Sequence, residues 1–255
     1  SIVVVDHKGT VIISSRQELI GRNVGFRDYF KLGVAHPDTG MLYSVAPFRS
    51  LLDGTPILSF SRVVLDQNGK VDAVISGHFG QEYFASLLNS ALYSPDMTSR
   101  LVHASGVQFV RVPSIDGLAG IQLLDSERTS MFARHWLSQK EASVQIGKDQ
   151  FTSVKHVIAQ QNINPQSVHL SQPLVVGVSR TVTAIYEGWY QQMAWLGGLY
   201  SLIVIITSLG LYLVQRRQRL YAQLQQHYFR TLDSAGDGVV SLAPDGTITY
   251  LNPAA

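Results

Sequence analysis

Residues Gly188 to Val214 read GWYQQMAWLGGLYSLIVIITSLGLYLV, a long run without a charge. A helix needs about 20 mostly apolar residues to cross the hydrocarbon core of a bilayer, and this run is long enough. Tryptophan and tyrosine favour the membrane–water interface. Trp189, Tyr190 and Trp195 stand near the first end of the run, and Tyr212 stands near the second. The sequence therefore predicts one membrane-spanning helix at 188–214.

Two other structures fit this run less well. A secretory signal peptide is N-terminal, whereas this run lies near the C-terminus of the chain. A buried helix of a soluble protein rarely needs so long an uncharged segment. We therefore interpret the run as a membrane span.

Arginines follow the span directly, in the segment QRRQR at 215–219. Arg and Lys close to the end of a span mark its cytoplasmic side. We therefore expect a protein of the inner (plasma) membrane, with residues 1–187 in the periplasm or outside the cell and residues 215–255 in the cytoplasm.

The composition argues against several classes of function. A net charge of +2 on 255 residues is not basic enough to indicate a nucleic-acid partner. The chain has no cysteine for a disulfide or a cysteine zinc site, and its eight histidines show no metal-ligand spacing. No cofactor is implied. Gly-x-Ser-x-Gly, His-Glu-x-x-His and a phosphate-binding glycine loop are missing from the sequence, so we do not expect this chain to be an enzyme.

Hairpin signals recur in the outer region. Apolar and β-branched runs flank turns that contain Gly9, Gly69 and Gly106, which is the pattern of β-hairpins. Apolar spacing predicts helices at Gln81–Tyr93 and Glu127–Lys140. Further strands are expected at 41–45, 56–60, 143–146, 151–158 and 174–178, and a helix at 180–192 is expected to run into the span. The fold class is α+β, with two successive antiparallel sheets that carry helices on one side.

The segment after the span, 215–231, is polar and helical in pattern. Leu213, Leu220 and His227 are spaced by seven residues, and a second set shares this spacing. This imperfect heptad pattern favours a coiled coil of two parallel helices, and hence a homodimer formed through the span and this linker. One solvated connecting helix is the alternative.

The last segment, 232–255, reads LDSAGDGVVSLAPDGTITYLNPAA. It resembles the opening of a PAS domain, with Asp-Gly before two hydrophobic residues, an Asp-Gly turn, a strand and Asn-Pro-Ala. The resemblance covers only the start of such a domain, and it leaves the cofactor of the PAS domain open. Because Ser1 also stands at the very start of a strand, we expect this chain to be a fragment cut at both ends.

The outer region resembles a double Cache sensor domain, which has two PAS-like modules in tandem and occurs in bacterial diguanylate cyclases and sensor histidine kinases. The matching segments are 3–15, 27–30, 56–62, 69–84, 111–113 and 172–178. The resemblance covers residues 2 to 189. Members usually begin with another membrane helix and a long outer helix, which this sequence does not include. The expected domains are a membrane-distal Cache module (1–93), a membrane-proximal Cache module (94–187), the span (188–214), the linker (215–231) and the PAS opening (232–255).

This resemblance implies a small-molecule site in the membrane-distal module, between the sheet and a loop that carries an Arg-x-Tyr element. Arg27 and Tyr29 fall on that loop by position. The expected ligand-binding residues are Arg27, Tyr29, Tyr43, Ser59, Ser61, Ser76 and His78. Period-two alternation places Ser59 with Ser61, and Ser76 with His78, on one face of each strand. Arg27 paired with an acid and His78 as a core residue are the structural alternatives.

The expected ligand is a small organic anion. Relatives that bind amino acids hold the ammonium group with an aspartate, and His78 stands at what looks like the position of that aspartate. An imidazole cannot replace a carboxylate there, so an amino-acid or amine ligand is not expected. Arg27 could pair with a carboxylate through two hydrogen bonds, and a protonated His78 could donate to an anion.

These features together predict a transmembrane receptor. The expected output, carried by domains outside this sequence, is cyclic di-GMP turnover by GGDEF or EAL domains. A sensor histidine kinase is the alternative. A chemoreceptor usually has a different linker after the span, and a membrane-anchored interaction domain needs neither a heptad linker nor a PAS segment.

Overall fold

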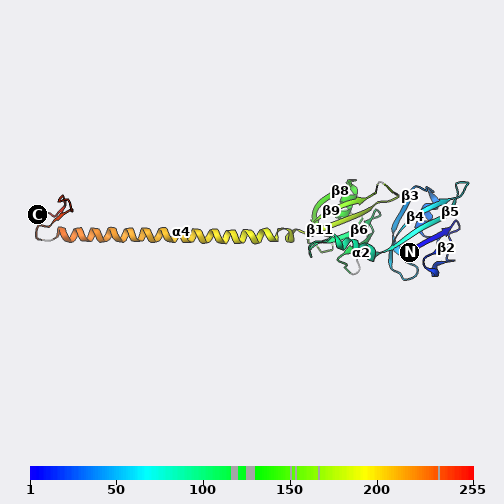
Figure 1. Ribbon diagram of the computed structural model, residues 1–255, viewed down its shortest axis with the longest axis horizontal. Helices are drawn as coiled ribbons and strands as arrows, with labels where there is room; N and C mark the ends of the chain where they lie inside the picture. The colour runs from blue at the N-terminus through cyan, green and yellow to red at the C-terminus, as the bar shows by residue number, and fades with distance from the viewer. Residues whose placement is uncertain (116–119, 125–129, 150, 153, 166, 235) are drawn as a thin grey trace. The chain divides into compact units, whose positions relative to one another are not determined.

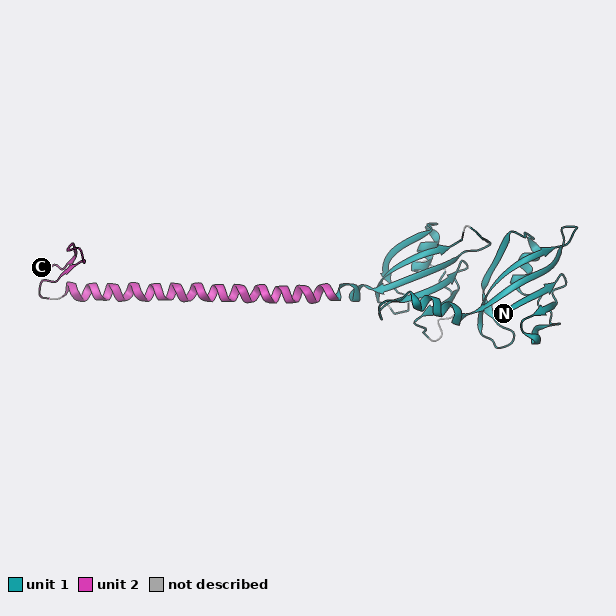
Figure 2. Cartoon of the chain, in the orientation of Figure 1, with its two compact units in different colours: residues 1–187 teal, residues 188–255 magenta. Residues whose placement is uncertain are grey.

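Two sheets, one of six strands and one of five, form the outer part of the chain (Figure 1). The structure is a computed structural model that describes residues 1–115, 120–124, 130–149, 151–152, 154–165, 167–234 and 236–255. These residues fall into two units, Ser1–Glu187 and Gly188–Ala255 (Figure 2). The predicted α+β class is confirmed.

The six-stranded sheet has the order β10-β3-β4-β5-β1-β2. All neighbours are antiparallel except β10 and β3, which are parallel. Its elements are β1 Ile2–Asp6, β2 Val11–Ser14, the short 3₁₀ helix η1 Gln17–Leu19, α1 Asp28–Ala35, β3 Met41–Arg49, β4 Pro56–Leu65, β5 Val71–Gly80 and β10 His169–Leu170. We call this part the distal module.

The core of the distal module lies between its sheet and α1. Val5, Val63 and Val74 come from three neighbouring strands and are almost fully buried, together with Tyr29 and Phe30 of α1. Branched apolar side chains of this kind pack well on a pleated surface. Each fully buried side chain contributes about 1.5–3 kcal/mol relative to an exposed one, so burial of this face holds α1 on the sheet.

The five-stranded sheet has the order β7-β6-β11-β9-β8 and is antiparallel throughout. Its elements are α2 Gln81–Ser90, β6 Thr98–His103, β7 Gln108–Val112, α3 Met131–Leu137, β8 Ala142–Lys148, β9 Lys155–Ile163 and β11 Leu174–Thr181. We call this part the proximal module. The helix α3 packs on one face of the sheet, against β8 and β9, and α2 packs against β6 and β7.

A shared apolar cluster joins the two modules. Leu58 of β4 packs with Leu101 of β6 and Phe109 of β7, and all three are 2% exposed or less. Phe84 of α2 contacts this cluster, with its ring 5.7 Å from that of Phe109 between centroids. The two modules are therefore coupled through a buried interface.

Among the described residues, several elements differ from the sequence-based expectations, and four of these differences concern the candidate site, the turn before β9 and the strands β10 and β11. The segment expected to be a loop around Arg27 is the start of α1, a helix too short to be stable by propensity alone and held by tertiary packing. The strand expected from Phe151 begins at Lys155, because the Asp149 carboxylate accepts hydrogen bonds from the backbone N–H groups of Phe151 and Thr152 and holds a turn.

The other two differences concern β10 and β11. Arg180, expected to be helical, lies in β11 opposite Val157, and the helix begins two residues later. Residues 169–170 belong to the segment 94–187, which was expected to form the second module. Yet β10 pairs with Met41 and Leu42 of the distal sheet. The Ser44 backbone N–H donates to Ser171 Oγ at 3.0 Å next to this pairing.

The helix α4, Val182–Asp233, is continuous and includes both the expected span and the expected linker. By length and composition it is a candidate membrane span, and no part of its most apolar window is buried in the structure. The pairing of two such helices in a homodimer stays a prediction.

A hairpin follows α4, formed by β12 Val240–Leu242 and β13 Ile248–Leu251. The buried Asn252 closes it, because its side chain accepts from the Val239 N–H at 2.9 Å and donates to the carbonyls of Leu232 and Asp237. This contact gives a physical reason for asparagine at the end of the segment that resembles a PAS opening.

An ion pair stands directly before α4. Arg180 donates from Nε and from one terminal nitrogen to the two oxygens of Asp96, both at 3.0 Å. The guanidinium also lies 5.5 Å from the centroid of the Tyr93 ring. The end of β11, where α4 begins, is thereby tied to the segment that follows α2.

Because of this ion pair, we expect the stability of the fold to depend on pH. Hydrogen bonds from Arg180, and then from Ser94, lower the pKa of Asp96 to about 2. A depressed carboxyl pKa stabilises the fold above the pKa of the unfolded chain, about 4, and this contribution is lost as pH falls towards 2. We expect Asp96→Asn to lower the melting temperature at pH 7, and the difference from wild type to vanish between pH 4 and pH 2. Circular dichroism melts of the full chain measure this. Arg180→Gln should give the same profile, and a difference that persists at pH 2 would contradict the assignment.

Candidate ligand-binding cavity

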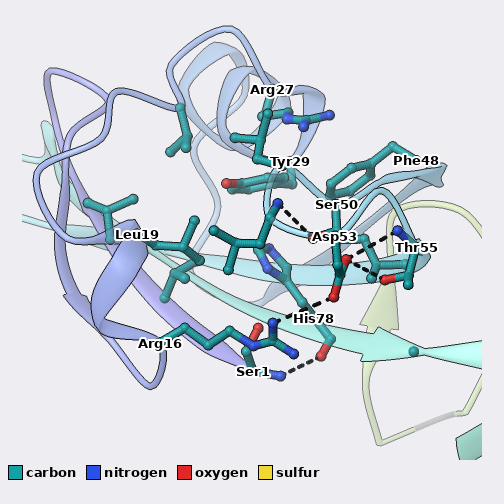
Figure 3. Close-up of a pocket in the computed structure, with 17 residues that line it drawn as sticks. Ser1, Arg16, Leu19, Arg27, Tyr29, Phe48, Ser50, Asp53, Thr55 and His78 are labelled. Carbon is teal, nitrogen blue, oxygen red and sulfur yellow. Dashed lines mark hydrogen bonds and ion pairs between the residues drawn. The ribbon is translucent and has the colours of Figure 1, made fainter.

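A cavity of about 130 Å³ lies in the distal module, between the sheet, η1, the start of α1 and the loop from β3 to β4 (Figure 3). Its volume is close to the ~150 Å³ of an engineered protein cavity that holds benzene. It is lined by Ser1, Val3, Val11, Arg16, Leu19, Val24, Arg27, Tyr29, Phe48, Ser50, Leu51, Leu52, Asp53, Thr55, Ile57, His78 and Gly80. Aliphatic, aromatic and charged side chains thus meet around a space that suits a small molecule.

Three rings from three elements form one wall of the cavity. Tyr29 of α1 stacks on Phe48 of β3 with 5.7 Å between ring centroids. His78 of β5 meets Tyr29 edge-on at 5.0 Å and Phe48 at 6.0 Å. Such arrangements are favourable beyond the area that they bury, so the rings hold one another in place. Burial raises the pKa of Tyr29 to about 12, so its hydroxyl keeps its proton at neutral pH.

His78 is neutral at neutral pH. Burial, chiefly, lowers its pKa to about 4, and the positive charge of Arg27 acts in the same direction. The expected donation from a protonated His78 would therefore require a pH below about 4. Its Nε2 atom is buried and has no hydrogen-bond partner among the described residues. A buried polar atom without a partner is costly, so this nitrogen is a suitable contact for a polar group of a ligand.

Opposite charges meet at the rim of the cavity. Arg16, just before η1, lies 3.6 Å from Asp53 of the β3–β4 loop, and both side chains are about half exposed. The Asp53 carboxylate accepts hydrogen bonds from the Thr55 hydroxyl at 2.7 Å and the Thr55 N–H at 3.1 Å. Hydrogen bonds from Thr55 and Ser50 lower the pKa of Asp53 to about 2, so it is charged at neutral pH. The rim thus has a charged carboxylate, at a position other than that of His78.

Arg27 is held by protein groups. Its guanidinium donates to the Arg49 carbonyl at 3.1 Å and lies 4.8 Å from the centroid of the Phe48 ring and 5.1 Å from that of Phe26. Figure 3 shows this guanidinium and Arg16 on opposite sides of the Tyr29 ring. Arg27 thus supports the aromatic wall, while Arg16 is the cation next to Asp53.

The structure brings only some of the expected site residues to the cavity. Arg27, Tyr29 and His78 line it, whereas Tyr43, Ser59, Ser61 and Ser76 do not. The register of β4 and β5 does place the serines and His78 on one face, because Ser59 is opposite His78 and Ser61 is opposite Ser76.

The remaining four residues make buried structural contacts. Ser59 Oγ and Ser76 Oγ share a hydrogen bond of 2.7 Å. Ser61 Oγ donates to the Tyr29 carbonyl at 2.9 Å, and therefore fixes α1 on the sheet. The Tyr43 hydroxyl donates to the His36 carbonyl and accepts from the Asp38 N–H, which closes the end of α1.

Sequence reasoning missed Arg16, Phe48 and Asp53. Asp53-Gly54 follows two leucines, and by pattern it is an ordinary turn signal. Arg16 stands in a polar stretch with no periodicity. Strict alternation along β3 would place Phe48 on the face opposite that of Tyr43. The irregular register between Val45 and Phe48 brings it to the same face, and the sequence pattern does not indicate this irregularity. The two charged residues approach each other only through the folded loop.

Solved structures match this chain in fold. It is similar to the extracellular domain of rpHK1S-Z16, a protein described as a histidine kinase, with a TM-score of 0.62 and 21% identity over 74% of this chain and 73% of that one. This chain shares the fold of extracytoplasmic sensor domains. No protein-family model and no curated protein matches the sequence.

Two further matches are domains of chemoreceptors. One is the ligand-binding domain of the amino acid chemoreceptor PctB of Pseudomonas aeruginosa PAO1 in complex with L-Arg, with a TM-score of 0.55 and 14% identity over 72% of each chain. The other is the periplasmic sensory domain of Tlp1 of Campylobacter jejuni, with a TM-score of 0.54 and 12% identity over 66% of this chain and 60% of that one. At these identities the likeness is one of fold.

Proposed function

We propose that this chain is the sensory part of a transmembrane receptor. Residues 1–187 bind a small molecule outside the inner membrane, α4 crosses the membrane, and the segment after it lies in the cytoplasm. The observation that carries the proposal is the distal cavity, which has an aromatic wall, a buried histidine nitrogen without a protein partner and a charged rim. The fold of the outer part, shared with sensor domains, supports the same function.

The ligand would act by favouring one of two arrangements of the receptor. A ligand shifts such an equilibrium only by its difference in affinity for the two states. The cavity is closed on one side by the β3–β4 loop, and β4 also carries Leu58 into the cluster that joins the modules. The strand β11 of the second module leads directly into α4. A shift of β4 on binding would thus reach the membrane helix through packed elements.

The output is a further part of the proposal. Two copies of α4 would pair in a homodimer, and the segment 232–255 would open a cytoplasmic PAS domain. We infer GGDEF or EAL domains beyond it, which make or degrade cyclic di-GMP. A histidine kinase is the second candidate, and the likeness in fold to the extracellular domain of rpHK1S-Z16 favours it.

For the ligand we propose a small organic anion, because the charged residues of the lining are two arginines and one aspartate. A zwitterion with a carboxylate and an ammonium group is the second candidate, and Asp53 at the rim favours it. The PctB domain, which shares the fold, was solved in complex with L-Arg. Asp53 would bind the ammonium group of a zwitterion, whereas its charge would repel an anion.

A substitution at Asp53 separates these two classes. We expect Asp53→Asn to leave the affinity for an anion unchanged or higher, because it removes a repelling charge and frees Arg16. For a zwitterion the same change should weaken binding by at least tenfold, because a charge-assisted hydrogen bond to the ammonium group is lost. Thermal shifts of the full chain in detergent, with panels of carboxylates, amino acids and amines, measure this. Asp38→Asn, an exposed acid of the same module that does not line the cavity, is the control. If only amines without a carboxylate shift the melting temperature, the anion proposal is wrong.

A further inference from the structure

One face of the proximal sheet carries a row of buried polar residues. Arg111 is opposite Arg100, Arg100 is opposite Gly177, and Gly177 is opposite Gln160, across β7, β6, β11 and β9. Residues opposite each other in antiparallel strands project from the same face. Arg100 is 9% exposed, Arg111 8% and Gln160 3%. Arg100 and Arg111 therefore project from the same face of neighbouring strands, and this is the face that α3 covers, because Phe132 of α3 packs on Val102 and Val175 of that face.

Among the described residues, the positive charges of this cluster outnumber the negative ones. Asp149, which follows β8, lies 3.8 Å from a terminal nitrogen of Arg111, and both side chains are almost fully buried. Burial lowers the pKa of Arg100 to about 10, with Asp149 opposing the shift, so Arg100 stays protonated at neutral pH. Burial also lowers the pKa of His156, which adds no positive charge there. Two buried cations thus share one buried anion among the described residues.

Several polar atoms of the cluster lack a partner. Nε of Arg111, Oε1 of Gln160 and Nδ1 of His156 are buried and make no hydrogen bond within the part of the chain that the structure describes. Buried polar groups in native proteins are almost always hydrogen-bonded to protein, water or an ion. Leaving a buried charge without compensation is strongly destabilising. This cluster therefore has both the charge and the hydrogen-bonding groups to hold a further ligand.

Gly177 makes room for the Arg100 side chain. A Cβ at Gly177 would lie 3.4 Å from both Cγ and Nε of Arg100, at the short limit of ordinary van der Waals contact. The Arg100 side chain thus lies against β11 at Gly177, and Gln160 is opposite Gly177 on β9. The second guanidinium, of Arg111, comes from the neighbouring strand.

We propose that this face of the proximal module is a second binding site, which holds a small carboxylate between Arg100 and Arg111. The planar guanidinium fork matches a carboxylate through two parallel hydrogen bonds. The near-complete burial of the cluster limits the ligand to a few heavy atoms, of the size of acetate. The site uses none of the residues that line the distal cavity, so it provides a second chemical input to the same receptor.

The test uses acetate as the probe and the full chain in detergent. Melting temperatures are compared in sodium acetate and in sodium chloride of equal concentration, so that ionic strength is matched. A ligand that binds only the folded state raises stability with the logarithm of its concentration. We expect a rise of about 5 °C or more over chloride at saturating acetate. Arg100→Gln should abolish it.

Two control variants locate the effect. Arg134→Gln removes the same charge from an exposed position of the same module, and it should keep the full acetate response. Arg27→Gln removes the side chain that supports the aromatic wall of the distal cavity. This variant should also keep the full acetate response, which would show that acetate does not act through the distal cavity.

A further variant keeps the test decisive if Arg100→Gln does not fold. Gln160→Glu adds a carboxylate of the chain itself to the same face as Arg100, one strand beyond Gly177. We expect this variant to melt at a higher temperature than wild type without acetate, and to respond to acetate no more than to chloride. The proposal is overturned if wild type gains nothing from acetate over chloride, or if the gain persists in Gln160→Glu.

Discussion

Replacing Ile205 and Ile206 with lysine is expected to prevent the chain from crossing a membrane. Both residues lie near the middle of the uncharged part of α4, and both are exposed in the isolated chain. Lysine at the centre of a span costs roughly 2.5–3.5 kcal/mol on insertion scales, so two cost roughly 5–7 kcal/mol. Membrane fractionation with alkaline extraction, together with protease protection of the outer domain, measures the loss.

The same helix supplies a matched control. Gln225→Lys with Gln226→Lys adds the same two charges to α4 beyond the arginines at 216, 217 and 219, where we expect cytoplasm. This variant should insert like wild type. If both double variants stay in the membrane fraction with the outer domain protected, 188–214 is not the span.

The second large effect is expected from Phe109→Ala. The Phe109 side chain is fully buried and packs with Leu58 of the distal sheet and with Leu101 and Phe84 of the proximal module. Truncating a buried phenylalanine to alanine typically costs about 3–5 kcal/mol, because apolar contacts are lost and a cavity remains. Because this cluster joins the modules, we expect both to lose stability together. Urea unfolding of the full chain, followed by circular dichroism and intrinsic fluorescence, measures the change.

Tyr83→Ala is the control for this substitution. Tyr83 lies on α2 next to Phe84, with 5.2 Å between their ring centroids, but it is 57% exposed. An exposed residue of this kind should contribute less than about 1 kcal/mol. An equal loss in both variants would mean that the Phe109 cluster is not the centre of the interface between the modules.

Features that depend on residues close together in the chain could be predicted from the sequence. Glycine turns between β-branched runs, such as Asp66–Gly69 between β4 and β5, predict their hairpins because the strands are neighbours in the chain. The helix α4, a candidate span by length and composition, could be predicted as well, because its uncharged run and the heptad spacing after it are contiguous in the chain. The predicted start of α2, Gln81, agrees with the structure, because the apolar residues that follow have helical spacing.

Features that depend on distant residues could not be predicted. The strand β10 joins the distal sheet by pairing with β3 across more than a hundred residues, and no local pattern encodes that register. The rim of the cavity needs Arg16 and Asp53 to approach through a folded loop. The lowered pKa of His78 follows from burial, which is a property of the packed site. In the proximal module, Arg100 and Arg111 are nine-tenths buried although arginine is usually exposed.

The distal cavity is the central claim, and Gly80 offers the most direct way to test it. Gly80 lines the cavity and shares the cavity face with His78 by alternation along β5. Its φ of −76° suits any residue, and an added Cβ meets open space. Gly80→Phe should therefore fill the cavity without strain. Ser86→Phe adds the same ring on the exposed side of α2, away from the cavity.

The measurement is a calorimetric titration of the full chain in detergent with the compound from the carboxylate, amino-acid and amine panels that gives the largest thermal shift. We expect saturable binding of one molecule per chain to wild type and to Ser86→Phe, and at least a hundredfold weaker binding to Gly80→Phe. Equal binding by Gly80→Phe and wild type, or no binding of any compound to wild type, would contradict a ligand site in this cavity.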